Sequence, residues 1–292
     1  MAGGKLSEIP PDARLLSPAK INLFLHVTGR RPDGYHLLQT WMQFLDWGDR
    51  MLFRTNRKGM IQRHDEHPYT LPAADLSIRA AEVLRQAAGR PELGADITLE
   101  KRVPPGTGLG GGSSNAATTL LVLNRLWQLH LSAAQLRDLG RGLGADVPVF
   151  LHGASAWAEG TGDLLTTMCP PAGWVAVALP GVAVSTESIF SDPGLRRDHP
   201  PVAVRDYTAG LTGNDLEAVT FQRHPEVAAA HRCLSQFGPA RMSGTGSAVF
   251  VPLPTREAAE QVIGQLPDGM TGLAARRLNR SPLQDWMPEP ES

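Results

Sequence analysis

The stretch "VPPGTGLGGGSSNAA", residues 103–117, contains five glycines within seven positions, followed by two serines. Glycine weakens the interior of a helix or a strand, so a cluster of this density indicates a segment whose function requires backbone without side chains. Two purposes are compatible with it. One is a flexible Gly/Ser linker, and the other is a loop that surrounds a phosphate with backbone N–H groups.

The flanking residues favour the phosphate loop. Upstream, residues 97–103 alternate apolar and polar side chains, which is typical of a strand. Downstream, Ser113 and Ser114 are residues that cap helices, and apolar residues recur at helical spacing through residues 116–127. A linker does not usually lead directly into an apolar helix. The sequence therefore predicts a glycine loop between a strand and a helix, with Ser113 or Ser114 either capping the helix or contacting phosphate or Mg²⁺.

Two well-known phosphate motifs do not account for the loop. Gly106 and Gly111 have the glycine spacing of a P-loop, but Gly112 stands where that motif requires lysine. Gly106, Gly108 and Gly111 match a dinucleotide fingerprint, which needs an acidic residue at a strand end about 20 residues later. Asp138, the residue in that region, lies inside a helical pattern instead. A third type of phosphate loop remains.

Composition limits the classes of function. The chain has 292 residues, 42% hydrophobic and 20% charged, which is typical of a soluble globular protein with one large domain or two ordinary ones. A formal net charge of -1 gives no electrostatic case for a nucleic-acid or membrane partner. Cys169 and Cys233 form neither a metal motif nor a disulfide framework, which favours a reducing compartment. Without a signal-peptide core or a long apolar run, we expect a cytoplasmic protein.

Strand and helix patterns are interspersed without strict alternation, which favours an α+β fold over a doubly wound sheet. We place a domain boundary near residue 155, giving domains 1–155 and 156–292. The patterns predict strands at 20–28, at 40–56 as one or two strands, and at 97–103, 173–186 and 271–278; a hairpin at 155–168; helices at 73–89, 116–127, 132–144 and 255–267; and two helices within 214–237.

Five segments in order carry a resemblance: "PAKINLFL", "RPDGYH", "GLGGGSSNAA", "LGADVPVF" and "SGTGSAVF". Together they resemble the GHMP kinase superfamily, whose members phosphorylate small alcohols, over nearly the whole chain from Ser17 to Leu283. The closest resemblance is to the branch whose substrate is 4-diphosphocytidyl-2-C-methyl-D-erythritol, in the non-mevalonate route to isoprenoids. The resemblance implies a two-domain fold. An N-terminal ATP domain like domain 2 of ribosomal protein S5 and a C-terminal ferredoxin-like domain would have the active site in the cleft between them.

The resemblance also implies the catalytic machinery. Lys20 and Asp146 match the catalytic lysine and aspartate of the family. We expect Asp146 to orient the substrate hydroxyl and to accept its proton late, and Lys20 to keep Asp146 ionised; the alternative is a buried ion pair without chemistry. ATP and Mg²⁺ are the implied cofactors, with the metal ligands unidentified. The glycine loop would hold the triphosphate through Pro104, Pro105, Gly106, Thr107, Gly108, Leu109, Gly110, Gly111, Gly112, Ser113 and Ser114.

Substrate recognition is implied in the same way. Tyr35, His36 and Phe190 match family residues that hold the cytosine, and Asn22 and Lys101 match positions near the substrate. The alternatives are a core role for Phe190 and a solvated strand position for Lys101. The family often has asparagine where this chain has Asp75, so an adenine contact there is not carried over.

Two other functions remain open at this point. One is another GHMP kinase, acting on homoserine, mevalonate or a sugar, against which Tyr35 and His36 argue. The other is a nucleotide sensor without activity, against which Lys20 and Asp146 argue. The expected partner is a small molecule, and the expected assembly is a monomer or a homodimer.

Overall fold

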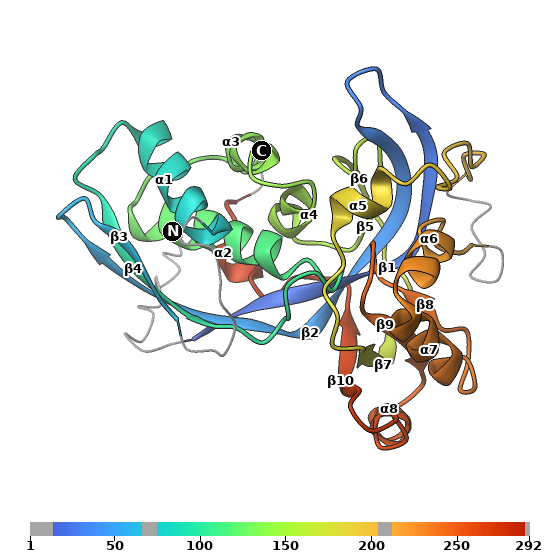
Figure 1. Cartoon of the computed structure of the whole chain (residues 1–292). Helices are drawn as coiled ribbons and strands as arrows, with labels where there is room; N and C mark the ends of the chain where they lie inside the picture. The colour runs from blue at the N-terminus through green and yellow to red at the C-terminus, as the bar shows by residue number, and fades with distance from the viewer. Residues whose placement is uncertain (1–13, 66–74, 204–211, 290–292) are drawn as a thin grey trace.

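The structure, a computed structural model, describes residues 14–65, 75–203 and 212–289 (Figure 1). Its strands are β1 (Leu15–Arg30), β2 (His36–Asn56), β3 (Ile61–Asp65), β4 (Gly94–Glu100), β5 (Ala156–Glu159), β6 (Leu164–Thr167), β7 (Gly173–Leu179), β8 (Arg241–Met242), β9 (Val249–Leu253) and β10 (Thr271–Leu278). Its helices are α1 (Leu76–Ala88), α2 (Gly111–Leu126), α3 (Ala133–Arg141), α4 (Val147–His152), α5 (Thr186–Phe190), α6 (Glu217–Arg223), α7 (Pro225–Leu234), α8 (Arg256–Ile263) and the 3₁₀ turn η2 (Gln284–Trp286).

The described strands form one sheet of ten, and β2 is the strand that connects its parts. The main path has the order β3-β4-β2-β10-β7-β9-β8. Strand β2 pairs with β1 over most of its length, with β5 at residues 40–42, with β10 at residues 44–45 and with β4 at residues 50–56. Figure 1 shows β1 and β2 in blue, running from the upper right of the molecule to its left side. The prediction of one or two strands at 40–56 is resolved as one.

Strand β1 is buried without interruption from Ser17 to Val27. A strand covered on both faces has such a run of buried residues, whereas a strand with one solvated face alternates. Because Lys20 lies inside this run, its side chain is taken away from water. A buried ammonium group needs partners, which makes this position exceptional.

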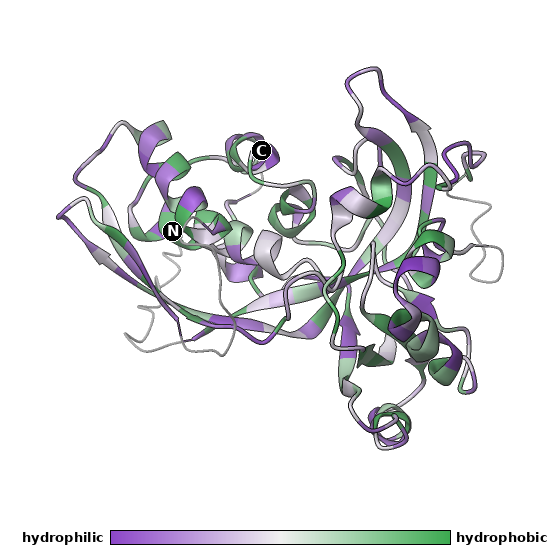
Figure 2. Ribbon diagram, in the orientation of Figure 1, coloured by the Kyte–Doolittle hydropathy of each residue, from purple (hydrophilic) through white to green (hydrophobic). Residues whose placement is uncertain are grey.

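Helices cover the two halves of the sheet separately. The group α1–α4 lies together over the left half in Figure 1, above a core that includes Ile97 and Leu120. On the other half, α6–α8 pack over a second core that includes Val227 and Val251. A third core, around Ile21, lies where the two halves meet. Figure 2 shows polar and apolar residues side by side along the helices, as expected for elements with one face on a core.

The start of α2 differs from the prediction. The helix begins at Gly111, and its N-cap is Gly110 in the left-handed region (φ 73°), with no side-chain cap hydrogen bond. Of the two alternatives for Ser113 and Ser114, capping of the helix is therefore wrong, because both serines lie inside its first turn. By contrast, Asp75 caps α1 through its side chain, which accepts from the backbone N–H groups of two residues in the first turn.

The mixed helix-and-sheet architecture confirms the α+β fold, and strands β5 and β6 form the predicted hairpin. The short helix α4 was not predicted. The boundary at residue 155 stays a prediction, and β1 and β2 contribute residues to the cores of both halves. Among the described residues, no helix combines the length and apolar character required to cross a bilayer.

Candidate active site

A cavity of about 280 Å³ lies where the halves meet. Its walls come from β1, β2, the glycine loop, the first turn of α2, the residues before α4, the turn between β5 and β6, α5, and the loop that precedes β9. The cavity is thus built from segments far apart in the sequence. Lys20, Asn22, Asp146 and Phe190 are the predicted side chains that line it, together with Gly108 and Ser113 of the glycine loop.

Lys20 and Asp146 meet in this cavity. The Nζ atom of Lys20 lies 3.1 Å from Oδ2 of Asp146. The lysine side chain is only 3% exposed, whereas the aspartate side chain is 35% exposed. The charge pair therefore has one buried member and one member that incoming molecules can reach. Asp146 occupies the N-cap position of α4 without capping it, so its carboxylate is not engaged by the helix.

Neighbouring groups fix the lysine. Its Nζ donates to Oδ1 of Asn22 at 2.6 Å and to the carbonyl oxygen of Gly108 at 3.0 Å. The amide of Asn22 in turn donates to Oγ1 of Thr40 at 2.9 Å. With Asp146, these acceptors give the three N–H bonds of the ammonium group one partner each. The ammonium position is thereby fixed between the glycine loop and the aspartate.

The glycine loop rests on the loop that precedes β9. Gly108 has φ +72°, and a Cβ atom there would lie 2.0 Å from the carbonyl oxygen of Ser243. Gly110 has φ +73°, and a Cβ atom there would lie 3.1 Å from the Lys20 side chain. The hydroxyl of Ser243 donates to the Gly108 carbonyl at 2.9 Å. Both glycines are therefore required by conformation and by close approach.

The two serines of the loop have different surroundings. Ser114 is fully buried, and its hydroxyl accepts a hydrogen bond from the Ser17 hydroxyl at 2.8 Å. Ser113 is half-buried and lines the cavity. The first intrahelical bond of α2 is made by the N–H of Ser114 to Gly110, so the N–H groups before it have no helical partner. Those N–H groups, with the Ser113 hydroxyl and Lys20, form a set of donors that fits phosphate oxygens.

The rings of His36 and Phe190 are in contact, and Phe190 lines the same cavity as the charge pair. Their ring centroids are 4.9 Å apart, with 35° between the ring planes. Arg197 donates from Nε to Nε2 of His36 at 3.1 Å. Burial lowers the pKa of His36 below its ordinary 6.5, and the positive charges of Arg197 and Arg30 lower it further. Tyr35 is 67% exposed and is the last residue of the loop between β1 and β2.

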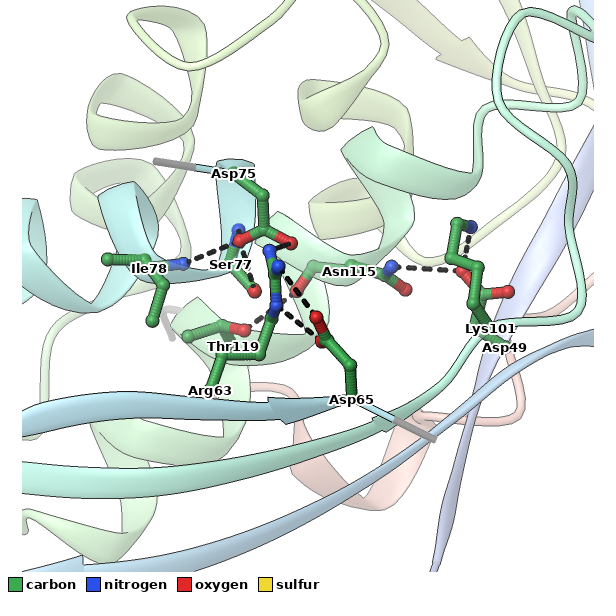
Figure 3. Close-up of polar contacts among 9 residues, drawn as sticks. All are labelled: Asp49, Arg63, Asp65, Asp75, Ser77, Ile78, Lys101, Asn115 and Thr119. Carbon is green, nitrogen blue, oxygen red and sulfur yellow. Dashed lines mark hydrogen bonds and ion pairs between the residues drawn. The ribbon is translucent and has the colours of Figure 1, made fainter. Parts of the chain in front are cut away.

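Lys101 lies beside Gly111, the first residue of α2, but does not line the cavity. Its Nζ forms an ion pair with Asp49, and the lysine side chain is 5% and the aspartate side chain 0% exposed (Figure 3). The amide of Asn115 donates to the same carboxylate at 2.9 Å. Burial lowers the pKa of Lys101, and Asp49 opposes that shift. Lys101 is not among the residues that line the described cavity, so its contact with substrate stays a prediction.

The carboxylate of Asp75 already has bonding partners within the chain. Figure 3 shows Arg63 between Asp75 and Asp65, with Nη1 of Arg63 2.6 Å from Oδ2 of Asp75. The other carboxylate oxygen accepts from the N–H of Ser77 at 3.0 Å. The aspartate at this position is therefore a helix cap and an ion-pair partner for β3.

Sequence reasoning missed several residues of the cavity. Thr186 and Thr245 both line it, and their hydroxyl groups form a hydrogen bond with 3.3 Å between the oxygens. Thr245 belongs to the second glycine-containing segment, whose position before a strand was the available signal. Nothing in the sequence pointed to Arg197, which reaches His36 across 161 positions.

Oxygen donors suited to a hard cation are present in the cavity, namely the Asp146 carboxylate and the Ser113 hydroxyl. In the described ranges of the chain, no group of three or more His, Cys, Asp or Glu residues is placed to hold a metal ion. The arrangement joins a phosphate cradle, a fixed cation and a reachable carboxylate within one cavity. Its chemistry fits transfer of a phosphoryl group to a hydroxyl.

Comparisons with known proteins agree with this chemistry. The model of the GHMP kinases N terminal domain matches residues 75–154, and the model of the GHMP kinases C terminal domain matches residues 197–271. The 4-diphosphocytidyl-2-C-methyl-D-erythritol kinase of Azoarcus sp. (strain BH72) is 49% identical over 267 residues, covering 91% of this chain and 94% of the relative.

Solved structures are similar over a comparable length. A crystal structure of 4-(cytidine 5'-diphospho)-2C-methyl-D-erythritol kinase has a TM-score of 0.78 and 34% identity, covering 91% of this chain and 99% of the other. A mevalonate kinase has a TM-score of 0.67 at 12% identity, covering 92% of this chain and 100% of the other, which shows a shared fold.

Proposed function

The chain belongs to the 4-diphosphocytidyl-2-C-methyl-D-erythritol kinases of the GHMP kinase family, and from this premise we propose how its residues perform the reaction. The enzyme transfers the γ-phosphoryl group of ATP to the 2-hydroxyl of 4-diphosphocytidyl-2-C-methyl-D-erythritol, in the non-mevalonate synthesis of isoprenoid precursors. The two-domain GHMP kinase fold predicted from the sequence is confirmed, with the cavity placed where the halves meet.

The pairing of Lys20 with Asp146 is the observation that carries the mechanism. In the proposed step, the substrate 2-oxygen forms a bond to the γ-phosphorus while the bond from that phosphorus to the β,γ-bridging oxygen breaks, and ADP leaves. Asp146 orients the hydroxyl and accepts its proton late, because an ionised carboxylate is a weak base and the transition state is loose. Lys20 keeps the carboxylate ionised and offsets the charge on the transferring group.

The glycine loop binds the triphosphate in this proposal. The N–H groups at the start of α2 and the Ser113 hydroxyl lie beside Lys20 and are the donors available to phosphate oxygens. The buried Ser114 hydroxyl instead bonds to Ser17, so its contribution is to hold the first turn of the helix. We also propose that Mg²⁺ accompanies ATP, with Asp146 and Ser113 as the nearest oxygen donors. A bound Mg²⁺ supplies charge neutralisation of the β- and γ-phosphates.

The aromatic residues bind the cytosine in this proposal. Phe190 and Tyr35 provide ring faces for stacking, which contributes ~1–3 kcal/mol for a base. His36 provides hydrogen bonding that distinguishes one base from another. Asn22 contributes by positioning Lys20, since its amide oxygen accepts from the ammonium group. We propose the cytoplasm as the location of the enzyme; the choice between a monomer and a homodimer stays open.

A substrate panel tests the proposal. Purified protein with Mg-ATP is given the cytidine diphosphate alcohol, homoserine, mevalonate and galactose, and release of ADP is measured. The cytidine substrate should exceed each of the others in kcat/KM by at least about 100-fold, the effect of misplacing a reacting group by about 1 Å. Comparable turnover of another alcohol would contradict the proposed substrate, and the absence of turnover with all four would contradict a catalytic role.

A further inference from the structure

Arg197 is held rigidly beside the proposed base site. Its Nη1 donates to the carbonyl of Leu195 at 3.0 Å, and its Nη2 donates to the carbonyls of Phe190 at 2.9 Å and Asp192 at 2.6 Å. Its Nε donates to Nε2 of His36 at 3.1 Å. One guanidinium group therefore ties the segment after α5 to the first residue of β2.

The direction of the last bond determines the protonation of His36. A guanidinium group has no acceptor and stays protonated, so Nε2 of His36 must offer its lone pair. A neutral imidazole has one proton, which must then be on Nδ1. Charged groups facing the ring are Arg30 on β1 and Arg197 after α5, and both lower the pKa of His36, after burial. The ring stays neutral, because an imidazolium could not accept this bond.

We propose that Arg197 is a positioning residue that fixes the Nδ1–H tautomer of His36 and thereby sets the preference for cytosine. The inference rests on the proposed function. In this proposal the fixed Nδ1–H of His36 donates to the base at position N3. Position N3 of cytosine is an acceptor, whereas N3 of uracil has a hydrogen and is a donor. A fixed Nδ1–H therefore favours the cytidine substrate over its uridine analogue, and a ring that exchanges tautomers discriminates less.

The first measurement is the tautomer itself, in the protein without ligand. Histidines are labelled with ¹⁵N, and the His36 ring signals are identified by their loss in His36→Gln. The wild-type ring should show the Nδ1–H tautomer, with a pKa below 6.5. In Arg197→Met the ring should exchange between tautomers and its pKa should rise. A wild-type ring protonated on Nε2, or an unchanged ring in Arg197→Met, would overturn the proposal.

The second measurement is substrate preference. In Arg197→Met, KM for the cytidine substrate should rise about 10-fold and the cytidine-to-uridine ratio of kcat/KM should fall about 10-fold, the size of losing one hydrogen bond. The kcat and the KM for ATP should stay at wild-type values. An unchanged ratio would overturn the specificity role. If the wild-type enzyme does not turn over the cytidine substrate, the proposed function fails, while the tautomer result stands or fails separately.

Arg223 provides a matched control. It forms an ion pair with Asp192 in the same segment after α5. The Arg223→Met variant therefore weakens the anchoring of this segment and removes one positive charge, while the bond from Arg197 to His36 is retained. It should keep the wild-type tautomer and the wild-type cytidine-to-uridine ratio. An equal loss in both variants would show that Arg197 acts only as an anchor, and would overturn the proposal.

Discussion

Replacing Gly108 by alanine should damage both stability and catalysis, because a Cβ atom there would lie 2.0 Å from the carbonyl oxygen of Ser243. The left-handed backbone (φ +72°) adds a cost of about 1–2 kcal/mol for a residue with a side chain. Relief of the clash moves the Gly108 carbonyl, which accepts from Lys20 and from the Ser243 hydroxyl. Losing these bonds adds about 2–3 kcal/mol. The total is about 4 kcal/mol, or roughly 10 °C in Tm for a chain of this size.

Gly89 is the control for the cost of the left-handed backbone conformation without a clash. It has φ +62°, and nothing lies within 4 Å of the Cβ position. Gly89→Ala should therefore lower Tm by only about 2–4 °C and leave kcat unchanged. For Gly108→Ala, kcat should fall by about 100-fold, since the ammonium group of Lys20 loses one of its fixed partners. Thermal unfolding and ADP release measure both effects. Similar Tm and kcat values in the two variants would refute the argument from close approach.

Four further outcomes are expected. Asp146→Asn should remove most turnover while ATP binding in calorimetry is kept, and a near wild-type kcat would reject Asp146 as the proton acceptor. Lys101→Met should cost about 3–5 kcal/mol in urea unfolding, because Asp49 is left buried without its cation; a cost under about 1 kcal/mol would contradict this. Burial, and after it the charge of His199, lowers the pKa of His26 to about 4. Below pH 6.5 the unfolded chain therefore binds the proton more tightly, and stability should fall by about 3 kcal/mol between pH 6.5 and 4, less steeply in His26→Phe. Gly110→Val should weaken ATP binding strongly and binding of the cytidine substrate little, whereas equal losses would indicate misfolding.

Local pattern and motif were sufficient to predict the position of the glycine loop and the pairing of two charged residues, while the roles of these residues stay predictions. The glycine loop between a strand and a helix was predicted from residues 97–127, and the structure brings Lys20 and Asp146 together as the resemblance implied. Helix capping was predicted wrongly, because the left-handed Gly110 starts α2 before the serines are reached. A strand-to-helix pattern gives the presence of a boundary more reliably than its position.

Contacts between distant segments that no motif carries could not be predicted. Lys101 is buried because Asp49, on a strand 52 positions earlier, neutralises it, and nothing near Lys101 in the sequence indicates that partner. Strand β2 is a single strand because β1 pairs with it from residue 36 to residue 51 and β4 from residue 50 to residue 56, and these pairings are decided by tertiary packing. The bond from Arg197 to His36 has the same long-range origin.

The support of the glycine loop has a consequence for synthesis of the chain on the ribosome. The carbonyl of Gly106 accepts from the N–H of Ser247, and the carbonyl of Thr107 accepts from the N–H of Ala248. The residues that hold the loop in place are therefore translated some 140 positions after it. A nascent chain that ends before these residues has the phosphate loop, Lys20 and Asp146, yet lacks the surface on which the loop rests. We therefore expect nucleotide affinity to emerge late in translation, after Ser247 and Ala248 have left the exit tunnel.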